Sequence, residues 1–400
     1  MENKNVPSIR FKGFIDDWEQ RKLKNIANYR NGKAHEKVED INGKFTIINS
    51  RFISIDGKVK RHTNEQVEPM LKGEIAMVLS DLPNGKALAK VFLVDKDEKY
   101  TLNQRIAGIT PKENMDSIFL SYRMNRNPYF LKFDSGVSQT NLSKPEVENF
   151  EALYPKKEEQ TKIGNFFKQL DETITLQERE LELLKLTKKS FLQQLFPKTN
   201  QRLPNIRFTN FHEDWEQRKL EGLAEYYDGT HQTPRYQESG VPFISVENIK
   251  DINNSNKYIS KEDYKKDFKI KPQINDIFMT RITAGVIGDT AILTNSDDMA
   301  YYVSLALIRA SKINPLYLEK YINNFEFKKE LHKKIIHTAF PKKINLGDLG
   351  TCLVKFPHSF EEQTKIGNFF KQLDETIILQ ENKLENLRNV KSAFLQKMFI

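Results

Sequence analysis

The 400-residue sequence lacks the features that mark several large classes of protein. It has one cysteine, Cys352, so no disulfide can form within the chain, and this indicates a reducing compartment. No apolar run approaches the ~18–20 residues that span a bilayer. The N-terminal residues MENKNVPSIR also lack the apolar core of a signal peptide. We therefore expect a soluble, cytoplasmic protein.

Motifs for catalysis and for cofactor binding are missing as well. The Gly-Lys pairs at 43–44, 57–58 and 85–86 are not followed by Ser or Thr, so none forms a phosphate-binding loop. The histidines and the cysteine have no metal-ligand spacing. Asn127-Pro128-Tyr129 is similar to the aromatic clamp of adenine methyltransferases, but the second proline and a glycine-rich cofactor motif are absent. We expect no catalytic site, no metal and no cofactor in this chain.

The composition indicates a folded and basic protein. The 27 Phe, 14 Tyr and 2 Trp can supply cores for two or three domains. The formal net charge is +9, and segments 158–196 and 361–399 together carry −1, so the remainder carries +10. A basic excess confined to that remainder favours a polyanionic partner. A generally lysine-rich proteome would explain the excess equally well.

Two segments of the sequence occur twice. Residues 158–178, EEQTKIGNFFKQLDETITLQE, return at 361–381 with one difference, Thr175 against Ile378. Residues 7–23, PSIRFKGFIDDWEQRKL, return at 204–220 as PNIRFTNFHEDWEQRKL, and both tryptophans of the chain lie in this tryptophan element. The chain is therefore ordered as tryptophan element, variable region and repeated segment, followed by the same three again.

Each repeated segment opens a predicted long helix. Apolar residues recur at steps of four and three, which is the spacing of a coiled-coil seam. Each helix of about 39 residues would be roughly 58 Å long. Neither can bury its stripe alone, so we expect the copies to pack on each other, and two independent surface helices are the alternative. The predicted seam residues are Ile163, Phe167, Leu170, Ile174, Leu181, Leu184, Phe191, Leu195, Ile366, Phe370, Leu373, Ile377, Leu384, Leu387, Phe394 and Met398.

Connectivity and polar seam positions add two expectations about the helices. A compact second half with neighbouring termini requires that the helices run antiparallel. The seam is interrupted at Gln177 and Lys188, and at the matching Gln380 and Lys391. Polar residues at such positions commonly fix the register of the partner helix.

The variable regions, about 24–157 and 221–360, have the pattern of short strands and helices. Lys72–Ser80 resembles Ile274–Ile282, because each is an acidic turn that leads into an apolar run. Runs of β-branched and aromatic residues separated by Gly, Asn, Asp and Pro predict strands joined by turns. The predicted fold class is α+β, with two pseudo-symmetric halves that each comprise a globular domain and a long helix. The predicted domains are 1–157, helix 158–199, 200–360 and helix 361–400.

Binding is the chemistry that the remaining residues suit best. The loop Gly229–Tyr236, GTHQTPRY, combines a basic group, amide and hydroxyl groups and an aromatic ring, which suit contacts to base edges and phosphates. In the first region, basic residues gather around Gly57. Any one of these residues is more often a solvated surface charge. The candidate DNA-binding residues are Arg51, Lys58, Lys60, Arg61, Asn84, Lys86, Gln139, Asn141, Lys144, Thr230, His231, Thr233, Arg235, Tyr236, Asn248, Arg281, Thr283, Lys342, Lys343 and Asn345.

The chain resembles the specificity subunits of type I restriction–modification systems. The doubled EEQTKIGNFF block, the DWEQRKL of the tryptophan element and the DGTHQTPRY…GVPFISVENI stretch carry the resemblance. It implies two target-recognition domains, each of which reads one half of a split site on double-stranded DNA. It also implies that the paired helices set the unread spacer and dock two adenine-methyltransferase subunits.

The resemblance places the chemistry on other subunits. S-adenosylmethionine, ATP and Mg²⁺ are expected on methyltransferase and nuclease-translocase partners, and this chain is not expected to be an enzyme. Individual base contacts do not follow, because recognition domains of this family diverge at those positions. A stand-alone DNA-binding regulator, a coiled-coil scaffold and an enzyme with a hidden site remain alternatives.

Overall fold

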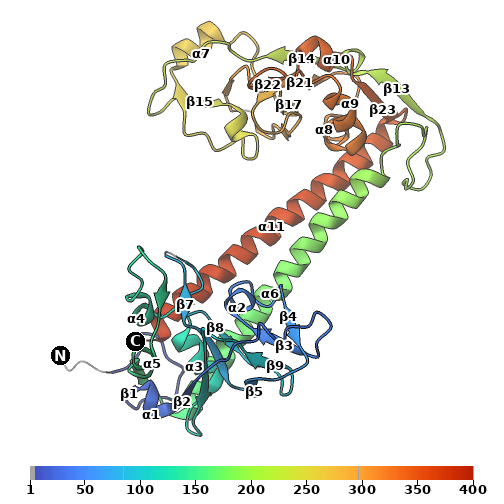
Figure 1. Cartoon of the computed structure of the whole chain (residues 1–400). Helices are drawn as coiled ribbons and strands as arrows, with labels where there is room; N and C mark the ends of the chain where they lie inside the picture. The colour runs from blue at the N-terminus through green and yellow to red at the C-terminus, as the bar shows by residue number, and fades with distance from the viewer. Residues whose placement is uncertain (1–4, 84, 296, 400) are drawn as a thin grey trace. The chain divides into compact units, whose positions relative to one another are not determined.

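Figure 1 shows the computed structural model of the chain, in which residues 5–83, 85–295 and 297–399 are described. The chain forms two compact units: unit 1 comprises Met1–Glu178 with Lys383–Ile400, and unit 2 comprises Arg179–Asn382. Two long helices, α6 (Lys157–Gln194) and α11 (Phe360–Met398), each contribute one end to each unit. Neither they nor any other helix in the described part of the chain has an apolar stretch that would cross a membrane.

Unit 1 is built on two four-stranded sheets. The first is antiparallel with the order β2-β10-β6-β8, and the second has the order β4-β3-β9-β5 with a parallel β3–β9 pair. Two-stranded ribbons are formed by β1 with β12 and by β7 with β11. The strands are β1 (Glu19–Lys22), β2 (Ala27–Asn31), β3 (Phe45–Ile48), β4 (Arg61–Thr63), β5 (Pro69–Met70), β6 (Ile75–Val78), β7 (Ser80–Asp81), β8 (Val91–Leu93), β9 (Tyr100–Leu102), β10 (Ile106–Pro111), β11 (Thr140–Asn141) and β12 (Glu151–Tyr154). The short helices are α1 (Leu23–Ile26), α2 (Ser50–Ser54), α3 (Ser117–Met124), α4 (Pro128–Leu131) and α5 (Lys144–Glu148).

Unit 2 repeats this topology with a different sequence, except that its second sheet has three strands instead of four. Its antiparallel sheet has the order β14-β21-β17-β19, its second sheet is β16-β15-β20 with a parallel β15–β20 pair, and its ribbons are β13–β23 and β18–β22. The strands are β13 (Trp215–Lys219), β14 (Ala224–Asp228), β15 (Val241–Ile244), β16 (Tyr258–Ile259), β17 (Ile277–Thr280), β18 (Ile282–Thr283), β19 (Thr290–Ile292), β20 (Ala300–Tyr301), β21 (Leu305–Ala310), β22 (Lys342–Lys343) and β23 (Leu353–Pro357). The 3-10 helices are η1 (Leu220–Gly222) and η2 (Val246–Asn248). The short α-helices are α7 (Lys261–Asp267), α8 (Pro315–Asn323), α9 (Phe325–His332) and α10 (Leu346–Gly350).

The central strand β6 is apolar throughout, and β17 is apolar except for Thr280, because both faces of each strand are covered. Ile75 and Met77 belong to a core that also contains Phe119 of α3, whereas Ala76 and Val78 belong to a second core on the other face. Successive side chains of a strand point to opposite faces, so a strand between two cores is apolar along nearly its whole length. The residues of β17 are divided between two cores in the same way.

The acidic turn that precedes each central strand supplies a carboxylate to an ion pair inside the unit. Glu74 is 5% exposed, accepts from the backbone N–H of Leu71 at 2.8 Å and pairs with Arg30 of β2. Asp276 takes the same place in unit 2, but there the arginine, Arg309, comes from β21. A buried carboxylate and its arginine thus fix the start of each central strand.

The long helices pack antiparallel within each unit, and the same pairs occur in both. In unit 1, Phe166 packs on Phe394, and Asp171 pairs with Lys391. In unit 2, these pairs return with the helices exchanged, as Phe191–Phe369 and Lys188–Asp374. A further reciprocal pair is Glu178–Arg388 in unit 1 and Lys185–Glu381 in unit 2. The predicted fold class, two α+β halves with paired antiparallel helices, is confirmed.

The predicted seam residues are buried to different degrees. Near the globular domains the seam residues join the cores, and along the helix pair they are partly covered. Lys188 and Lys391, two of the polar interruptions, carry the reciprocal ion pairs that fix the register. The buried seam residues are Ile163, Phe167, Ile174, Leu195, Ile366, Phe370, Ile377, Leu384 and Met398. The half-buried ones are Leu170, Leu181, Leu184, Phe191, Leu373, Leu387 and Phe394.

Candidate nucleic-acid interface

Arg281 organises the candidate loops of unit 2 and is itself buried. It follows β17 and is 6% exposed. Its guanidinium donates to the backbone oxygens of Val303 and Ile344, each at 3.0 Å, and pairs with Asp228 at 2.8 Å. Asp228 also lies 3.0 Å from the ring of His231. Arg281 therefore holds three segments together, and its N–H groups are largely used inside the protein.

The β18–β22 ribbon lies directly after Arg281 and presents two lysines. Thr283 pairs with Lys342 across the ribbon, and both Lys342 and Lys343 are exposed. Asn345 follows and donates to Asp348 at 3.1 Å. Ribbons of this width fit the major groove of DNA, and lysines beside them suit the phosphates.

The loop after β14 presents most of its candidate residues to solvent. Thr233, Arg235 and Tyr236 are exposed, and the Tyr236 ring rests edge-on against Phe243 with centroids 5.7 Å apart. Thr230 is held by a backbone bridge to the strand-end residue Tyr302. The loop is thus anchored at its base and open at its middle.

The side chain of Asn248 is half-buried and bonds to nearby backbone atoms. Its side chain accepts from the backbone N–H of Ser245 at 3.1 Å and donates to the oxygen of Asn254 at 3.2 Å. Its amide completes the cap of η2. This bonding explains the asparagine without a DNA contact.

In unit 1 the basic candidates on and after α2 form one group. Arg51, Lys58 and Lys60 are exposed, and Arg61 of β4 pairs with Glu39 at 3.0 Å. They belong to the segment next to the second sheet, β4-β3-β9-β5. The group is separate in sequence and topology from the β7–β11 ribbon.

Asp81 shapes the loop that leaves β7. Its carboxylate accepts from the backbone N–H groups of Ala87 at 2.7 Å and Leu88 at 3.1 Å. Lys86 is exposed on this loop. The candidate Asn84 lies outside the described residues.

The other strand of this ribbon carries the last candidates of unit 1. Gln139 donates to the hydroxyl of Ser80 at 2.6 Å, which ties the loop before β11 to β7. Asn141 is exposed on β11. Lys144 is exposed at the start of α5 and lies 3.6 Å from Glu148.

Each unit therefore brings some of its candidates together at one ribbon. The sequence interpretation missed the aspartates that hold these loops, although Asp228 lies next to Gly229 in a turn-forming pair. The residues gathered at the unit 2 ribbon and its Arg281 centre are Thr230, His231, Arg281, Thr283, Lys342 and Lys343. Those at the unit 1 ribbon are Lys86, Gln139 and Asn141.

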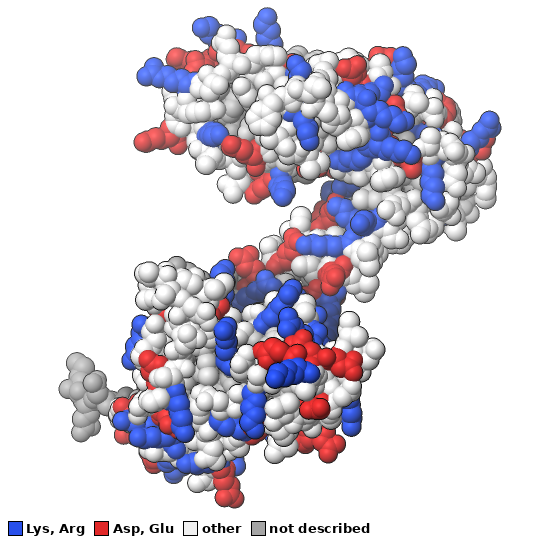
Figure 2. Space-filling view, viewed as in Figure 1, with Lys and Arg blue, Asp and Glu red and all other residues white. Residues whose placement is uncertain are grey.

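Basic side chains are distributed on both units. Figure 2 shows Lys and Arg over the viewed face of each unit, with Asp and Glu among them. The topology of the loops therefore marks the candidate interface more sharply than charge does.

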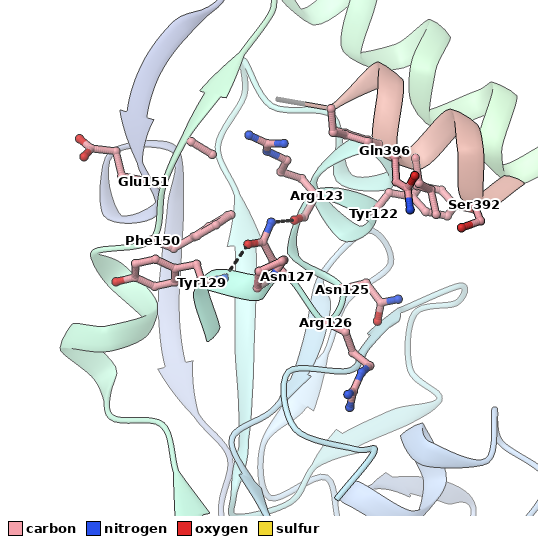
Figure 3. Close-up of a pocket in the computed structure, with 14 residues that line it drawn as sticks. Tyr122, Arg123, Asn125, Arg126, Asn127, Tyr129, Phe150, Glu151, Ser392 and Gln396 are labelled. Carbon is pink, nitrogen blue, oxygen red and sulfur yellow. Dashed lines mark hydrogen bonds between the residues drawn. The ribbon is translucent and has the colours of Figure 1, made fainter. Parts of the chain in front are cut away.

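A cavity of about 550 Å³ in unit 1 is lined by Asn127, Pro128 and Tyr129, the residues similar to a methyltransferase clamp (Figure 3). The Asn127 side chain accepts from the N–H of Tyr129 at 3.0 Å and donates to the oxygen of Arg123 at 3.0 Å. It is the N-cap of α4, so its amide serves to begin a helix. Within the described residues, no group of three or more His, Cys, Asp or Glu could hold a metal ion.

The repeated segments contain a buried ion pair in each unit. Glu159 is 1% exposed and accepts from Arg10 through two contacts of 2.6 and 2.7 Å. Glu362 is 0% exposed and accepts from Arg207 at 2.7 and 2.8 Å. The hydrogen bonds to the glutamates raise the pKa of both guanidinium groups. Each pair ties a tryptophan element to the start of a long helix.

The glutamine that follows each buried glutamate joins the long helix to the globular domain of its unit. Gln160 accepts from the backbone N–H of Asp116 at 2.9 Å and donates to the oxygen of Pro155 at 2.8 Å. Gln363 makes the equivalent two bonds in unit 2. We call the buried contacts of the glutamate and the glutamine in each unit the internal joint. The residues are repeated because each unit contains one such joint.

Other repeated residues point outward in both copies, and together they form what we call the repeated exposed surface. The single difference between the copies, Thr175 against Ile378, is also exposed. The members are Glu158, Lys162, Asn165, Lys168, Gln169, Glu172, Thr173 and Leu176 on α6, and Glu361, Lys365, Asn368, Lys371, Gln372, Glu375, Thr376 and Leu379 on α11.

Comparisons with known proteins give a consistent result. The family model described as type I restriction modification DNA specificity domain matches residues 15–186 and 212–389. The type I restriction enzyme MjaVIII specificity subunit of Methanocaldococcus jannaschii is 23% identical over 399 residues, with 95% of this chain and 91% of that protein covered. A putative MjaX specificity subunit of the same organism is 23% identical over 252 residues, with 57% of this chain and 59% of that protein covered.

A solved structure shares the fold. The crystal structure of a type I restriction–modification S subunit from M. genitalium matches with a TM-score of 0.66 at 15% sequence identity, and 99% of each chain is covered. Because the two family matches fall one on each half and together span most of the sequence, the chain belongs to the type I restriction–modification DNA specificity family, as a specificity subunit with two repeated target-recognition domains.

Proposed function

We propose that this chain directs a cytoplasmic type I restriction–modification complex to a bipartite site on double-stranded DNA. Each recognition domain reads one half-site, and the long helices dock two adenine-methyltransferase subunits. Nuclease-translocase subunits join the complex for restriction. S-adenosylmethionine, ATP and Mg²⁺ are held by those partners, and this chain itself is not catalytic.

The repeated exposed surface is the observation that carries the proposal. The internal joint accounts for Glu159, Gln160 and their counterparts, but it does not account for eight identical exposed residues in each copy. Exposed positions tolerate change, so an identical exposed set is best explained by an identical partner that binds twice. One methyltransferase on each copy satisfies this requirement.

The contrast with the recognition domains supports two different half-sites. The two ribbons have one topology, but the strand positions that hold Thr140 and Asn141 in unit 1 hold Lys342 and Lys343 in unit 2. Different side chains in equivalent places match different base edges. One recognition scaffold therefore serves two sequences.

The helices suit the role of setting the spacer. A helix of 38 residues such as α6 extends roughly 57 Å at 1.5 Å per residue. That length parallels about 17 base pairs at ~3.4 Å each. It accommodates two half-sites and an unread gap.

Co-expression with an adenine methyltransferase from the same system tests the proposal. Native mass spectrometry should give one copy of this chain with two methyltransferases, and the complex should bind its DNA site much more tightly than the chain alone. A stand-alone regulator would bind its site tightly without any partner, and that outcome would contradict the proposed role.

A further inference from the structure

Equivalent loop ends in the two units each expose apolar side chains. In unit 1, Leu82 follows β7 and is 68% exposed, and Val137 precedes β11 and is 86% exposed. In unit 2, Val286 follows β18 and is 62% exposed, and Phe340 precedes β22 and is 93% exposed. We call these four the tip residues.

The strand pairing places the tip residues of each unit at one end of its ribbon. Asp81 pairs with Thr140 in unit 1, and Thr283 pairs with Lys342 in unit 2. Because the strands are antiparallel, the chain that leaves one strand and the chain that enters the other lie at the same end. Each ribbon therefore ends in two loops that carry apolar groups.

Hydrogen bonds hold the backbone of these loops. Thr280 donates to the oxygen of Val286 at 2.8 Å, and Ile336 donates its N–H to the oxygen of Lys343 at 2.7 Å beneath the Phe340 turn. In unit 1, Asp134 accepts from Gly136 at 3.0 Å, next to Val137. The apolar side chains are thus presented by ordered backbone.

We propose that the tip residues are apolar wedges that contact the base-pair stack of the half-site, with Phe340 as the principal one. The proposal rests on the proposed function. Apolar side chains inserted at a base step unstack it partly and bend the duplex, and an aromatic ring can stack on an exposed base. The wedge gives each ribbon sequence discrimination through the deformability of the step.

The charges around Phe340 favour DNA over a protein surface as its partner. Lys342 and Lys343, both exposed, follow it after Pro341, and Lys86 is exposed on the loop that begins with Leu82. Lysines beside an apolar side chain can bind the phosphates that flank a base step. The Phe340 ring then contacts the base-pair stack, and the lysine ammonium groups contact the phosphate backbone of the same duplex.

The test uses the complex with co-expressed methyltransferase and a duplex that carries the site found by methylation mapping. Phe340→Ala should weaken binding about ten- to a hundredfold, with no change in the slope of log affinity against log salt. Lys343→Ala should lower that slope by about one. Phe325→Ala is the matched control, because Phe325 is 64% exposed in the same unit but lies on α9.

Duplexes with 2-aminopurine at successive positions locate the contact. The wild-type and Phe325→Ala complexes should increase the fluorescence at one step in one half-site, and Phe340→Ala should abolish the increase. Equal binding and fluorescence in Phe340→Ala and wild type would overturn the proposal. Loss of methyltransferase from Phe340→Ala would also overturn it, because the ring would then be a protein contact. If the wild-type complex bound no mapped site, the proposed function itself would fail.

Discussion

The arginine that pairs with the buried glutamate of each repeated segment is the side chain on which the helix joint depends most. The carboxylates of Glu159 and Glu362 are not solvated, since both side chains are almost completely buried. Removing one partner of a buried ion pair leaves an uncompensated charge, which costs far more than the loss of a surface pair. Loss of the arginine should therefore destabilise the joint in each unit more than loss of a surface ion pair would.

Arg10→Met should lower the free energy of unfolding by about 3–5 kcal/mol, as measured by urea denaturation. Arg207→Met should have a similar effect in unit 2. Lys156→Ala, which removes a pair with the exposed Asp16, is the control and should leave the transition unchanged. A small effect of Arg10→Met would show that the pair is not needed to hold the tryptophan element.

Glu74 gives the stability of unit 1 a dependence on pH. Burial alone would raise its pKa, but the hydrogen bonds from Arg30, Thr110 and the backbone of Leu71 outweigh burial and hold the pKa below its ordinary 4.5. A depressed carboxylate pKa contributes stability that is present above 4.5 and is lost as the pH falls through the folded-state value.

Glu74→Gln should therefore destabilise unit 1 at pH 7, and its difference from wild type should shrink as the pH is lowered below about 4.5. Thermal unfolding at a series of pH values measures this difference. A difference that grew towards acid pH would mean that the Glu74 pKa is raised rather than lowered.

At the scale of elements, two glycines of the repeated segments let each recognition domain approach its helix. A Cβ at Gly164 would lie 2.9 Å from the backbone nitrogen of Phe119, and one at Gly367 would lie 2.7 Å from the Cβ of Leu316. A backbone nitrogen or a Cβ atom at such a distance cannot move aside cheaply, because neither is the far end of a flexible side chain. These glycines are therefore kept although glycine is a poor helix former.

Gly164→Ala and Gly367→Ala should each destabilise the protein by about 1–3 kcal/mol, although alanine ordinarily stabilises a helix. Gly347→Ala in α10 is the matched control, because its added Cβ would meet nothing within 4 Å. It should be neutral or stabilising in the same urea denaturation. Stabilisation by Gly164→Ala would contradict the close approach.

The repeated exposed surface leads to a prediction about assembly. Lys168→Glu and Lys371→Glu should each release one of two methyltransferase subunits, and the double variant should release both, as counted by native mass spectrometry. Lys189→Glu is the control, because Lys189 is exposed on α6 but its counterpart in the second copy is Ser392. Full assembly of the double variant would exclude these lysines from the docking surface.

The helices and their antiparallel packing were predictable because a long apolar period and a doubled chain leave few other solutions. The inward placement of Glu159 and Gln160 was not, since such residues are usually exposed and only the Arg10 and Asp116 contacts explain their burial. The burial of Arg281 at the candidate interface was likewise not predictable from the sequence. Its position after an apolar run was visible, but its partners come from distant segments.

At the scale of the whole molecule, the repeated parts of the chain are separate from the parts that vary. The joints, the helix pairs and the exposed helix surface occur twice, whereas the residues of the ribbons and of the loops at their ends differ. Under the proposed function, a chain organised in this way would change one half-site when one domain is changed. The same partners would then act on the new site.

Replacement of residues 24–157 by the corresponding region of another family member, followed by adenine-methylation mapping in cells that also express the methyltransferase, tests this claim most directly. We predict that the wild-type chain directs methylation to one split motif, and that the chimera changes one half of the motif and keeps the other half. A change in both halves, or methylation without any split motif, would contradict the account.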